Sequence, residues 1–294
     1  MKNWKSLAVI PLIMISACKK EETDPPGTDT SGPRLVFKFK FDPDQERLNN
    51  FGQPSSIPAE HGAQTPDFNG MSAHYIELAP SGYTPLGEGE VVFYGAETNV
   101  GGEKAVDFSK AIIKGDGEVF YSIPLSQVAT GNYQWARVSL AYQNFDINFR
   151  WDNVDYTGTL ASFVAYRSYI NTYKIKTASR SVNANKDQGY WGFEATYPVV
   201  GAVTIDGQAQ GTTVPNPLFD TSPIPAGSCV VTGQFENGLT ITGNETEDIV
   251  VTLSFSINNS FEWYDVDQDN IYETQAGDYP VDMGIRGLIP IVEP

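Results

Sequence analysis

The segment Leu35-Val36-Phe37-Lys38-Phe39-Lys40-Phe41 has a large apolar side chain at every second position, with lysines at two of the positions between them. Successive side chains of a β-strand point to opposite faces. This alternation is therefore typical of a strand with one face on a hydrophobic core and the other in water. The body of the chain is predicted to open with an amphipathic strand.

The same alternation recurs in residues 145–151 and 249–257. Turn signals such as Gly115-Asp116-Gly117 and Glu236-Asn237-Gly238 separate many of the strand-like runs, and no long segment has a sustained helical period. The sequence therefore predicts an all-β protein, a β-sandwich or jelly roll of antiparallel sheets with little helix. Shorter strand-like runs are found at 73–79, 90–94, 118–123, 132–142, 158–170, 190–197, 228–235 and 238–242.

Residues 34–294 are predicted to form a single large β-sandwich domain. A subdivision near residues 214–227 is the alternative, because four prolines lie between positions 215 and 225. The apolar residues Leu218, Phe219 and Ile224 favour a long packed loop over a linker.

The N-terminal segment has the features of a secretory signal. Lys2 and Lys5 precede an apolar run over residues 7–15, which is shorter than the roughly 20 residues that a membrane span needs. The sequence Ile15-Ser16-Ala17-Cys18 that follows resembles a bacterial lipobox. The resemblance implies removal of residues 1–17 as a signal peptide and modification of the Cys18 thiol by diacylglycerol, with palmitate as an acyl chain. An ordinary signal peptide that carries a cysteine is the alternative.

Lys19-Lys20-Glu21-Glu22-Thr23-Asp24 places three acidic residues just behind Cys18. This run resembles the acidic tag of surface-exposed outer-membrane lipoproteins of the Bacteroidota, although two lysines precede its first acid. The resemblance implies a lipid anchor in the outer membrane and a body that faces the cell exterior. A solvated linker is the alternative. Residues 18–33 contain no large apolar side chain and are predicted to be a flexible tether that reaches about 20 Å.

The charge of the chain excludes one class of partner. The signal peptide takes two of the 19 basic residues and none of the 36 acidic ones, which leaves a net charge of −19. A nucleic-acid-binding surface needs clustered lysine and arginine, so no nucleic acid partner is expected. With Cys18 carrying lipid, Cys229 has no internal disulfide partner. Its setting in Cys229-Val230-Val231 predicts a buried, unreactive thiol.

The stretch from Asp265 to Glu273 resembles the first half of a calcium loop. Asp265, Asp267 and Asp269 lie at spacing two, and Glu273 follows. Hard carboxylate oxygens on a tight turn suit Ca²⁺. The pattern departs from an EF-hand in three respects: Asn270 replaces the usual glycine, Ala276 occupies position twelve, and no helical pattern flanks the loop. Asp278 or Asp282 would then complete a non-helical site, and a solvated hairpin tip is the alternative.

The only two histidines, His61 and His74, lie near Met71, and histidine and methionine are copper ligands. Two patterns, Phe-x-Phe-x-Phe-Asp at Phe37–Asp42 and Gly-Asn-Tyr-x-x-x-Arg-Val at Gly131–Val138, resemble those of MbnP-like copper-binding β-sandwich proteins of the cell envelope. The resemblance implies a copper site without placing the family's ligands on particular residues. The alternative is a core histidine at position 74, on the face of Ile76 and Leu78.

Aromatic residues recur in pairs along the chain. Tyr190 and Trp191 are flanked by glycines on both sides and are predicted to be ligand-binding rings that stack on a glycan or grip a surface protein. No nucleophile elbow, metalloprotease motif or phosphate loop is found, so no enzyme activity is predicted. The sequence thus favours a lipid-anchored cell-surface protein with a non-catalytic binding role. The alternatives are a calcium- or copper-binding envelope protein and a carboxylate-based glycan hydrolase.

Overall fold

The computed structural model describes residues 32–209 and 223–294, and these residues are almost entirely β-strand. The predicted all-β fold with little helix is confirmed, since the helical elements of this part of the chain are the two short 3-10 turns η1 (Phe108–Lys110) and η2 (Leu125–Gln127). No helix of these residues is long and apolar enough to cross a membrane. The predicted signal peptide, Cys18, the acidic tag and positions 214–222 of the proline-rich stretch lie outside the described residues.

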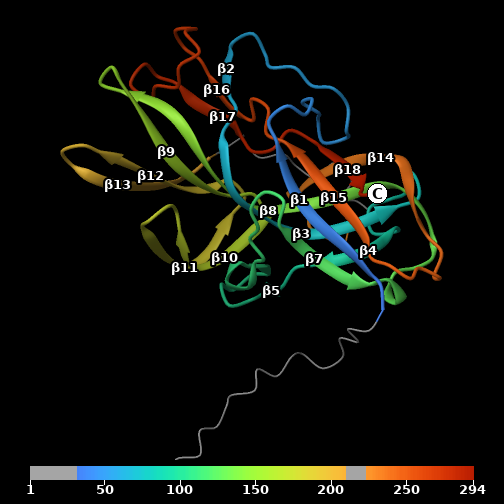
Figure 1. Cartoon of the computed structure of the whole chain (residues 1–294). Coiled ribbons are helices and arrows are strands. Elements are labelled where there is room, and N and C mark those ends of the chain that lie inside the picture. The colour runs from blue at the N-terminus through green and yellow to red at the C-terminus, as the bar shows by residue number, and fades with distance from the viewer. Residues whose placement is uncertain (1–31, 210–222) are drawn as a thin grey trace, which may run out of the picture. The chain divides into compact units, whose positions relative to one another are not determined.

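The longest strand, β8 (Gly131–Trp151), runs through two differently covered parts of the fold (Figure 1). β3 (Asp67–Ala79) pairs with β8 along one edge. On the other edge, β8 pairs first with β14 (Cys229–Ile241) and then with β9 (Val154–Phe163). The two halves of β8 thus share one edge neighbour and differ in the other.

The sheet built around β8 has seven strands in the order β13-β12-β9-β8-β3-β4, with β14 also on β8, and it curls into a half-barrel. Its remaining strands are β4 (Glu90–Tyr94), β12 (Tyr190–Tyr197) and β13 (Gly201–Gln208). Among the described strands β13 pairs with β12 alone, so β13 is an edge strand.

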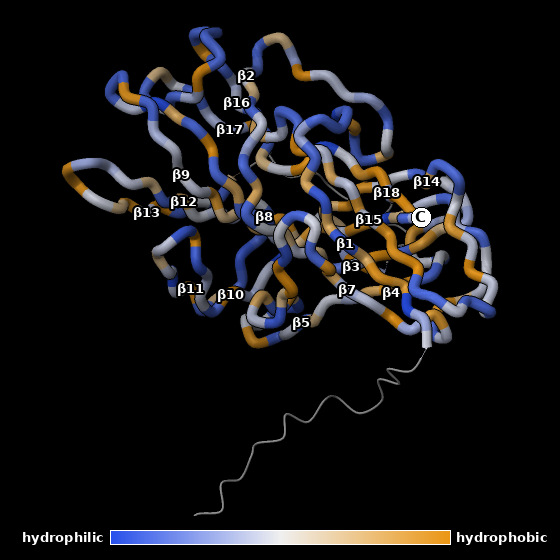
Figure 2. The backbone as a smooth tube through the Cα atoms, viewed as in Figure 1, coloured by the Kyte–Doolittle hydropathy of each residue, from blue (hydrophilic) through white to orange (hydrophobic). Residues whose placement is uncertain are grey.

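The first half of this sheet packs against a four-stranded sheet, and together they form the sandwich. The second sheet has the order β18-β15-β1-β7. Its central pair, β1 and β15, is parallel, which departs from the predicted antiparallel pairing, whereas its two outer pairs are antiparallel. Phe37 and Phe39 of the opening strand are fully buried in its core, together with Val138 and Leu140 of β8. Figure 2 shows how apolar residues recur along these strands. The strands are β1 (Arg34–Asp42), β7 (Val119–Pro124), β15 (Ile249–Ser256) and β18 (Leu288–Val292).

The second half of the seven-stranded sheet is covered on both faces. A four-stranded sheet in the order β11-β10-β6-β5 packs over Tyr142 and Phe163, and a three-stranded sheet in the order β17-β16-β2 packs over Phe145 and Leu160. The first of these sheets contains β5 (Glu97–Thr98), β6 (Ala105–Asp107), β10 (Arg167–Lys174) and β11 (Ser179–Asp187). The second contains β2 (His61–Gln64), β16 (Phe261–Tyr264) and β17 (Tyr279–Met283).

Candidate functional site

A groove of about 360 Å³ lies between the seven-stranded sheet and the three-stranded sheet. Its floor comes from β8, β9, β12 and β13, and its wall comes from β16, β17 and the loop between them. Fifteen residues line it, and eight of these have aromatic rings: Ile147, Phe149, Trp151, Leu160, Trp191, Phe193, Tyr197, Ile205, Phe261, Tyr272, Thr274, Asp278, Tyr279, Pro280 and Met283. A concave, mostly apolar space of this size is typical of a ligand-binding site.

The alternation of the strands places the floor residues on one face. Phe149 and Trp151 are two apart on β8, and Trp191 and Phe193 are two apart on β12. Ile205 of β13 lies directly opposite Phe193 across the strand pair. Trp151 and Ile205 keep 39% and 52% of their surface exposed, so the groove offers apolar surface that the fold itself leaves uncovered.

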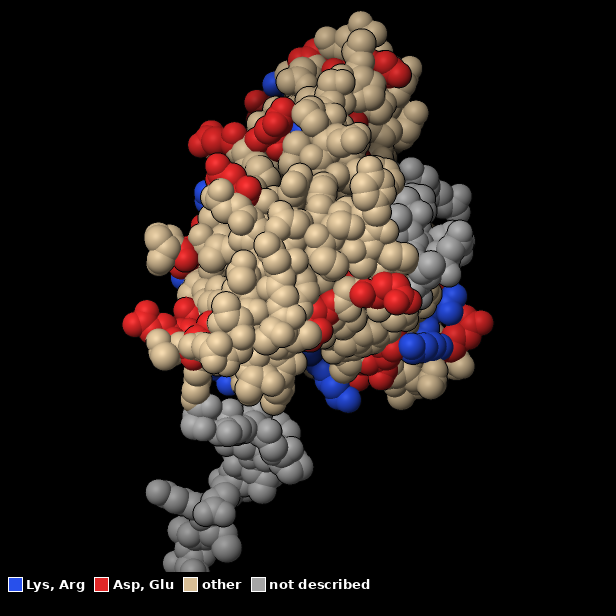
Figure 3. Space-filling model, turned by 90° about the vertical axis from the view of Figure 1, so that its right-hand side faces the viewer, with Lys and Arg blue, Asp and Glu red and all other residues tan. Residues whose placement is uncertain are grey.

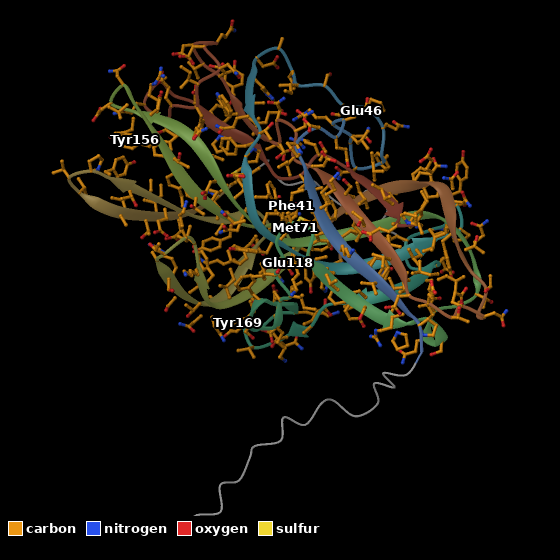
Figure 4. The ribbon with its side chains drawn as sticks, in the orientation of Figure 1. Phe41, Glu46, Met71, Glu118, Tyr156 and Tyr169 are labelled. Carbon is orange, nitrogen blue, oxygen red and sulfur yellow. The ribbon has the colours of Figure 1, made fainter. Side chains whose placement is uncertain are left out.

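Aromatic contacts hold the rings of the groove in place. Phe149 packs edge-on against Phe193 with ring centroids 5.4 Å apart, and Phe261 packs edge-on against Tyr272 at 5.1 Å. At the outer end of the groove, the rings of Tyr156 of β9 and Tyr197 pack with centroids 4.8 Å apart. Figure 4 shows Tyr156 toward the end of the hairpin that β8 and β9 form. Such pairs restrain the rings, so a ligand would meet a surface that is already ordered.

The structure separates the two neighbouring residues that the sequence singled out together. Trp191 lines the groove, whereas Tyr190 is buried on the opposite face of the sheet. The Tyr190 hydroxyl donates to Asp206 Oδ2 at 3.0 Å. Because neighbouring side chains of a strand face opposite ways, only Trp191 is available to a ligand here.

Seven further rings of the groove were not singled out as ligand-binding from the sequence: Phe149, Trp151, Phe193, Tyr197, Phe261, Tyr272 and Tyr279. The alternation of residues 145–151 gave a signal for Trp151. Tyr272 and Tyr279 lie more than 80 positions beyond Trp191 in sequence, and no local pattern connects them with it.

The groove offers few polar partners. Among the described residues, its side-chain polar groups are those of Thr274 and Asp278, the tyrosine hydroxyls and the indole N–H groups of two tryptophans. Both carboxylate oxygens of Asp278 already accept backbone N–H groups, from Val266 at 3.0 Å and from Glu273 at 2.9 Å. Asp278 therefore fastens the loop that forms the wall, and little hydrogen-bonding capacity remains for a ligand.

The same loop brings the predicted calcium carboxylates together. Asp265, Asp267 and Asp269 each have an oxygen within 4.8 Å of the others. Asp265 is buried and accepts from the N–H groups of Gln268 at 2.9 Å and Asn270 at 2.8 Å, so the turn closes around it. No other group of three potential metal-ligating acids, histidines or cysteines is found in the described part of the chain.

The backbone of the acidic loop also follows the expected pattern. Asn270, which stands where a calcium loop usually has glycine, adopts a left-handed φ of 58°. Loss of some hydration and the neighbouring carboxylates, Asp269 foremost, raise the pKa of the exposed Asp267. Burial and the carboxylates of Asp269 and Asp267 likewise raise the pKa of Glu273, which does not belong to the group of three. A divalent cation would relieve this repulsion.

Asp278 and Asp282, the two acids considered as completing ligands, have other partners. Asp278 accepts the backbone N–H groups of the loop, and Asp282 makes an ion pair of 2.7 Å with Arg286. Neither belongs to the group of three. The protein oxygens assembled in this loop therefore come from the three aspartates at spacing two.

The copper candidates have separate surroundings. His61 Nδ1 lies 2.7 Å from Glu262 Oε1 in the three-stranded sheet, and Met71 is buried in the sandwich core (Figure 4). His74 Nε2 lies 3.4 Å from Glu97 Oε1, and its ring packs against Tyr94 at 4.9 Å. Neither histidine belongs to a group of metal-ligating side chains in the described residues.

The surroundings of His74 also correct its expected orientation. The pairing of β3 with β8 shifts register at Ser72/Ala73 and again at Ala73/Tyr75. These irregularities interrupt the alternation, so His74 is buried beside Tyr94 and Tyr166 and does not share the face of Ile76 and Leu78. The sequence alternative of a core histidine is right in burial and wrong in face.

A second cleft of about 540 Å³ is lined by Asp67, Asp116 and Asp146 together with polar residues. A glycan hydrolase needs a carboxyl group with a raised pKa as its acid. Although burial opposes it, hydrogen bonds from Lys176, Thr159 and Asn69 lower the pKa of Asp146. The pKa of Asp146 is thus shifted in the opposite direction to the one that a general acid requires.

The two cysteine predictions have different outcomes. Cys229 is a buried free thiol, as predicted, and burial raises its pKa to about 12, so almost none of it is thiolate at neutral pH. Cys18 lies outside the described residues and its lipidation stays a prediction. Comparison of the chain with known protein families, curated proteins and solved structures found no match.

Proposed function

We propose that this chain is a non-catalytic binding protein of the cell envelope, and that the aromatic groove takes an extended apolar segment of a protein partner. The observation that carries this proposal is the lining of the groove, where eight aromatic rings and five aliphatic side chains meet only two other polar residues. Aromatic side chains and methionine are the residues enriched where proteins bind one another.

The lining favours a protein segment over a glycan in this groove. A sugar carries a hydroxyl on almost every carbon, and each hydroxyl that loses water without a new partner costs about 1–3 kcal/mol. Asp278 is engaged by two backbone N–H groups, which leaves the Thr274 hydroxyl, the tyrosine hydroxyls and two indole N–H donors to serve a ligand. Apolar side chains of a peptide need no such partners.

The edge of the sheet offers a second mode of contact to the same segment. β13 is an edge strand beside the groove, and Val203 and Ile205 on it are exposed. Unpaired backbone groups of an edge strand are able to accept an added strand, with alternate side chains of the peptide entering the pockets beside it. The hairpin that ends in Val199 and Val200, both strongly exposed, continues the apolar surface.

A displayed library of extended peptides, selected on the full chain, tests the groove. We expect enrichment of peptides with aromatic or branched apolar residues at alternate positions. Ile205→Asp should weaken the selected peptides at least tenfold, because it places a charge on an apolar floor. Binding is measured by the change in tryptophan fluorescence on titration.

Val100→Asp is the matched control, because it adds the same charge to a 71% exposed position that does not line the groove. Peptides that bind wild type and the Ile205→Asp protein equally well, or a library without apolar enrichment, would remove the groove as the binding site.

The acidic loop supports a second activity, the binding of Ca²⁺. Asp265, Asp267 and Asp269 would hold the ion through carboxylate oxygens, as hard cations prefer. The loop also contributes Tyr272, Thr274 and Asp278 to the wall of the groove. Calcium would therefore order the wall against which the protein segment packs.

Several millimolar Ca²⁺ should raise the melting temperature of the full chain, since ligand that binds only the folded state stabilises it by about 1–2 kcal/mol at roughly a five- to fiftyfold excess over Kd. Extracellular calcium sites often have Kd values of about 0.1–1 mM. Mg²⁺ should reproduce the rise poorly, because it prefers a tighter octahedral shell. Differential scanning calorimetry in chelator and in each ion measures the effect.

Asp267→Ala should abolish the rise and leave the melting temperature in chelator unchanged or slightly higher, because one repelling charge has gone. Asp155→Ala, on the exposed β8–β9 hairpin, is the matched control. An equal rise in the Asp267→Ala protein would mean that the loop does not bind Ca²⁺ and is a solvated hairpin tip.

The place of action that we propose is the outer membrane, reached through a lipid on Cys18, with the body facing the cell exterior. The lipobox-like sequence and the acidic run behind it support this placement. The charge of the mature chain supports anchoring by acyl chains, since an acidic protein gains nothing from anionic lipid head groups.

A further inference from the structure

A third cleft, of about 660 Å³, lies beside the first half of β8, far along the strand from the aromatic groove. It opens on the face of the sheet that is turned away from the sandwich core: Arg137 and Thr232 pair across β8 and β14, while their neighbours Val138 and Val231 point into the core. The lining residues are Phe51, Gln53, Pro80, Ser81, Gly82, Tyr83, Gln134, Trp135, Arg137, Thr232 and Gln234.

Three aromatic rings border this cleft. Tyr83 is 98% exposed and Phe51 is half exposed, so neither ring is packed in the core. Trp135 lies against Gly82, where an added Cβ would come within 3.2 Å of the indole. Glycine at position 82 therefore lets the loop lie close on the Trp135 ring and hold it as one side of the cleft.

Hydrogen bonds to the carboxylate of Glu77 hold the loop that carries Tyr83 in place. The buried carboxylate of Glu77 accepts from the N–H groups of Gly87 at 3.0 Å and Gly89 at 2.8 Å, and from the Tyr75 hydroxyl at 2.8 Å. At the tip, Tyr83 N–H donates to Ser81 Oγ at 3.2 Å. A loop held in this way loses little further freedom when a ligand binds.

Arg137 lines the cleft, and two of its donor atoms have no hydrogen-bond partner in the described residues. Arg137 is fully buried, and its Nη1 lies 3.6 Å from Glu77 Oε1, too far for a hydrogen bond. Nη2 donates to the carbonyl of Gly82 at 3.4 Å, but Nε and Nη1 have no hydrogen-bond partner in the described residues. Buried donors without partners are rare in folded proteins, and here they keep a positive charge beneath the cleft.

The side chains at the mouth define the chemistry of that ligand. Gln53, Gln134 and Gln234 supply amides that both donate and accept, and Ser81 and Thr232 supply hydroxyls. Among the described residues no carboxylate lines the cleft, and the one charged lining residue, Arg137, is balanced by Glu77. Figure 3 shows that the side of the molecule that carries β14 has a broad area without charged residues.

We propose that this cleft binds a neutral glycan chain. The rings of Tyr83, Trp135 and Phe51 cover the C–H faces of successive sugars, whose partial positive charge suits the negative face of an aromatic ring. The amides and hydroxyls bond the sugar hydroxyls at the rim. This site stands apart from the aromatic groove and takes a different class of ligand.

The test uses the full chain, purified in detergent, and hexasaccharides of β-linked glucose, mannose and xylose, α-linked glucose and galacturonate. We expect one or more of the neutral hexasaccharides to bind, measured by tryptophan fluorescence and calorimetry. Tyr83→Ala should weaken that binding about tenfold by removing a stacking ring. At its exposed position this substitution leaves the core intact.

Tyr264→Ala, which removes a 36% exposed tyrosine outside the cleft, should leave glycan binding unchanged, and so should the groove variant Ile205→Asp. The proposal is overturned if no neutral hexasaccharide binds at 10 mM, if Tyr83→Ala binds like wild type, or if galacturonate binds more tightly than every neutral chain. Loss of binding in Ile205→Asp alone would move the glycan to the groove.

Discussion

Phe39→Asp should abolish folding of the body of this protein. Phe39 is fully buried, stacks on Phe120 at 4.3 Å and meets Phe255 edge-on at 5.4 Å. Loss of a buried phenylalanine ring alone costs about 3–5 kcal/mol. An unpaired carboxylate in its place costs several kcal/mol more. The sum reaches the whole margin of roughly 5–15 kcal/mol that keeps a domain folded.

The measurement is thermal and denaturant unfolding of the full chain followed by circular dichroism. Val119→Asp is the matched control, because it places the same charge at a 44% exposed position on the strand paired with β1. We expect the control to unfold within about 1 kcal/mol of wild type. Cooperative unfolding of Phe39→Asp at the wild-type midpoint would mean that β1 is not part of the core.

Cys18→Ala should release the protein from the membrane. If Cys18 carries the lipid, its removal takes away every acyl chain, and anchoring by acyl chains falls by about 0.8 kcal/mol for each CH₂ withdrawn from the bilayer. The apolar run of residues 7–15 is too short to act as a second anchor. The expected result is loss of palmitate label and a shift from the membrane to the soluble fraction.

Cys229→Ala separates lipidation from the mere loss of a thiol. Cys229 is buried in the sandwich core, so its removal should leave palmitate label and fractionation unchanged. A Cys18→Ala protein that carries no acyl label and yet stays with the membrane would disprove the lipid anchor. Digestion of intact cells by an added protease then tests whether the body faces the exterior.

The local alternation of the sequence was sufficient to predict the sandwich strands. Leu35, Phe37 and Phe39 are all buried in β1, and Leu253 and Phe255 are buried in β15. This success has a simple physical basis: each of these strands has one face on a core, and a strand of this kind shows its burial in every second residue.

The alternation did not predict the extent of β8, which runs from one hydrophobic core into another. Residues 132–142 and 145–151 were predicted as separate strands, but β8 joins them. Its buried residues change phase, from Val138 and Leu140 in the first core to Phe145 and Ile147 in the other. Irregular pairing with β3 produces this change without a turn, and no glycine or proline in the sequence marks it.

The candidate sites differ in the same way: a site built from neighbours in sequence was predictable, and one built from distant strands was not. The acidic loop was predictable, because Asp265, Asp267 and Asp269 are neighbours in sequence and one turn brings them together. Trp191 was found by its flanking glycines, but the groove around it depends on the pairing of β12 with β9 and on the packing of β17 beside them. Such distant packing leaves no local signal in the sequence.

The parallel pair of β1 and β15 has a consequence for how the chain is made. Arg34 N–H donates to Asp248 Oδ1 at 2.7 Å across 214 positions of sequence, and the eight-residue parallel ladder starts beside it. While the ribosome works, β1 emerges first and its partner emerges almost last. Closing so large a loop has a high entropy cost, and folds dominated by such distant contacts form slowly. The four-stranded sheet of the sandwich is therefore completed only after β15 has been synthesised, and until then β1 lacks its parallel neighbour.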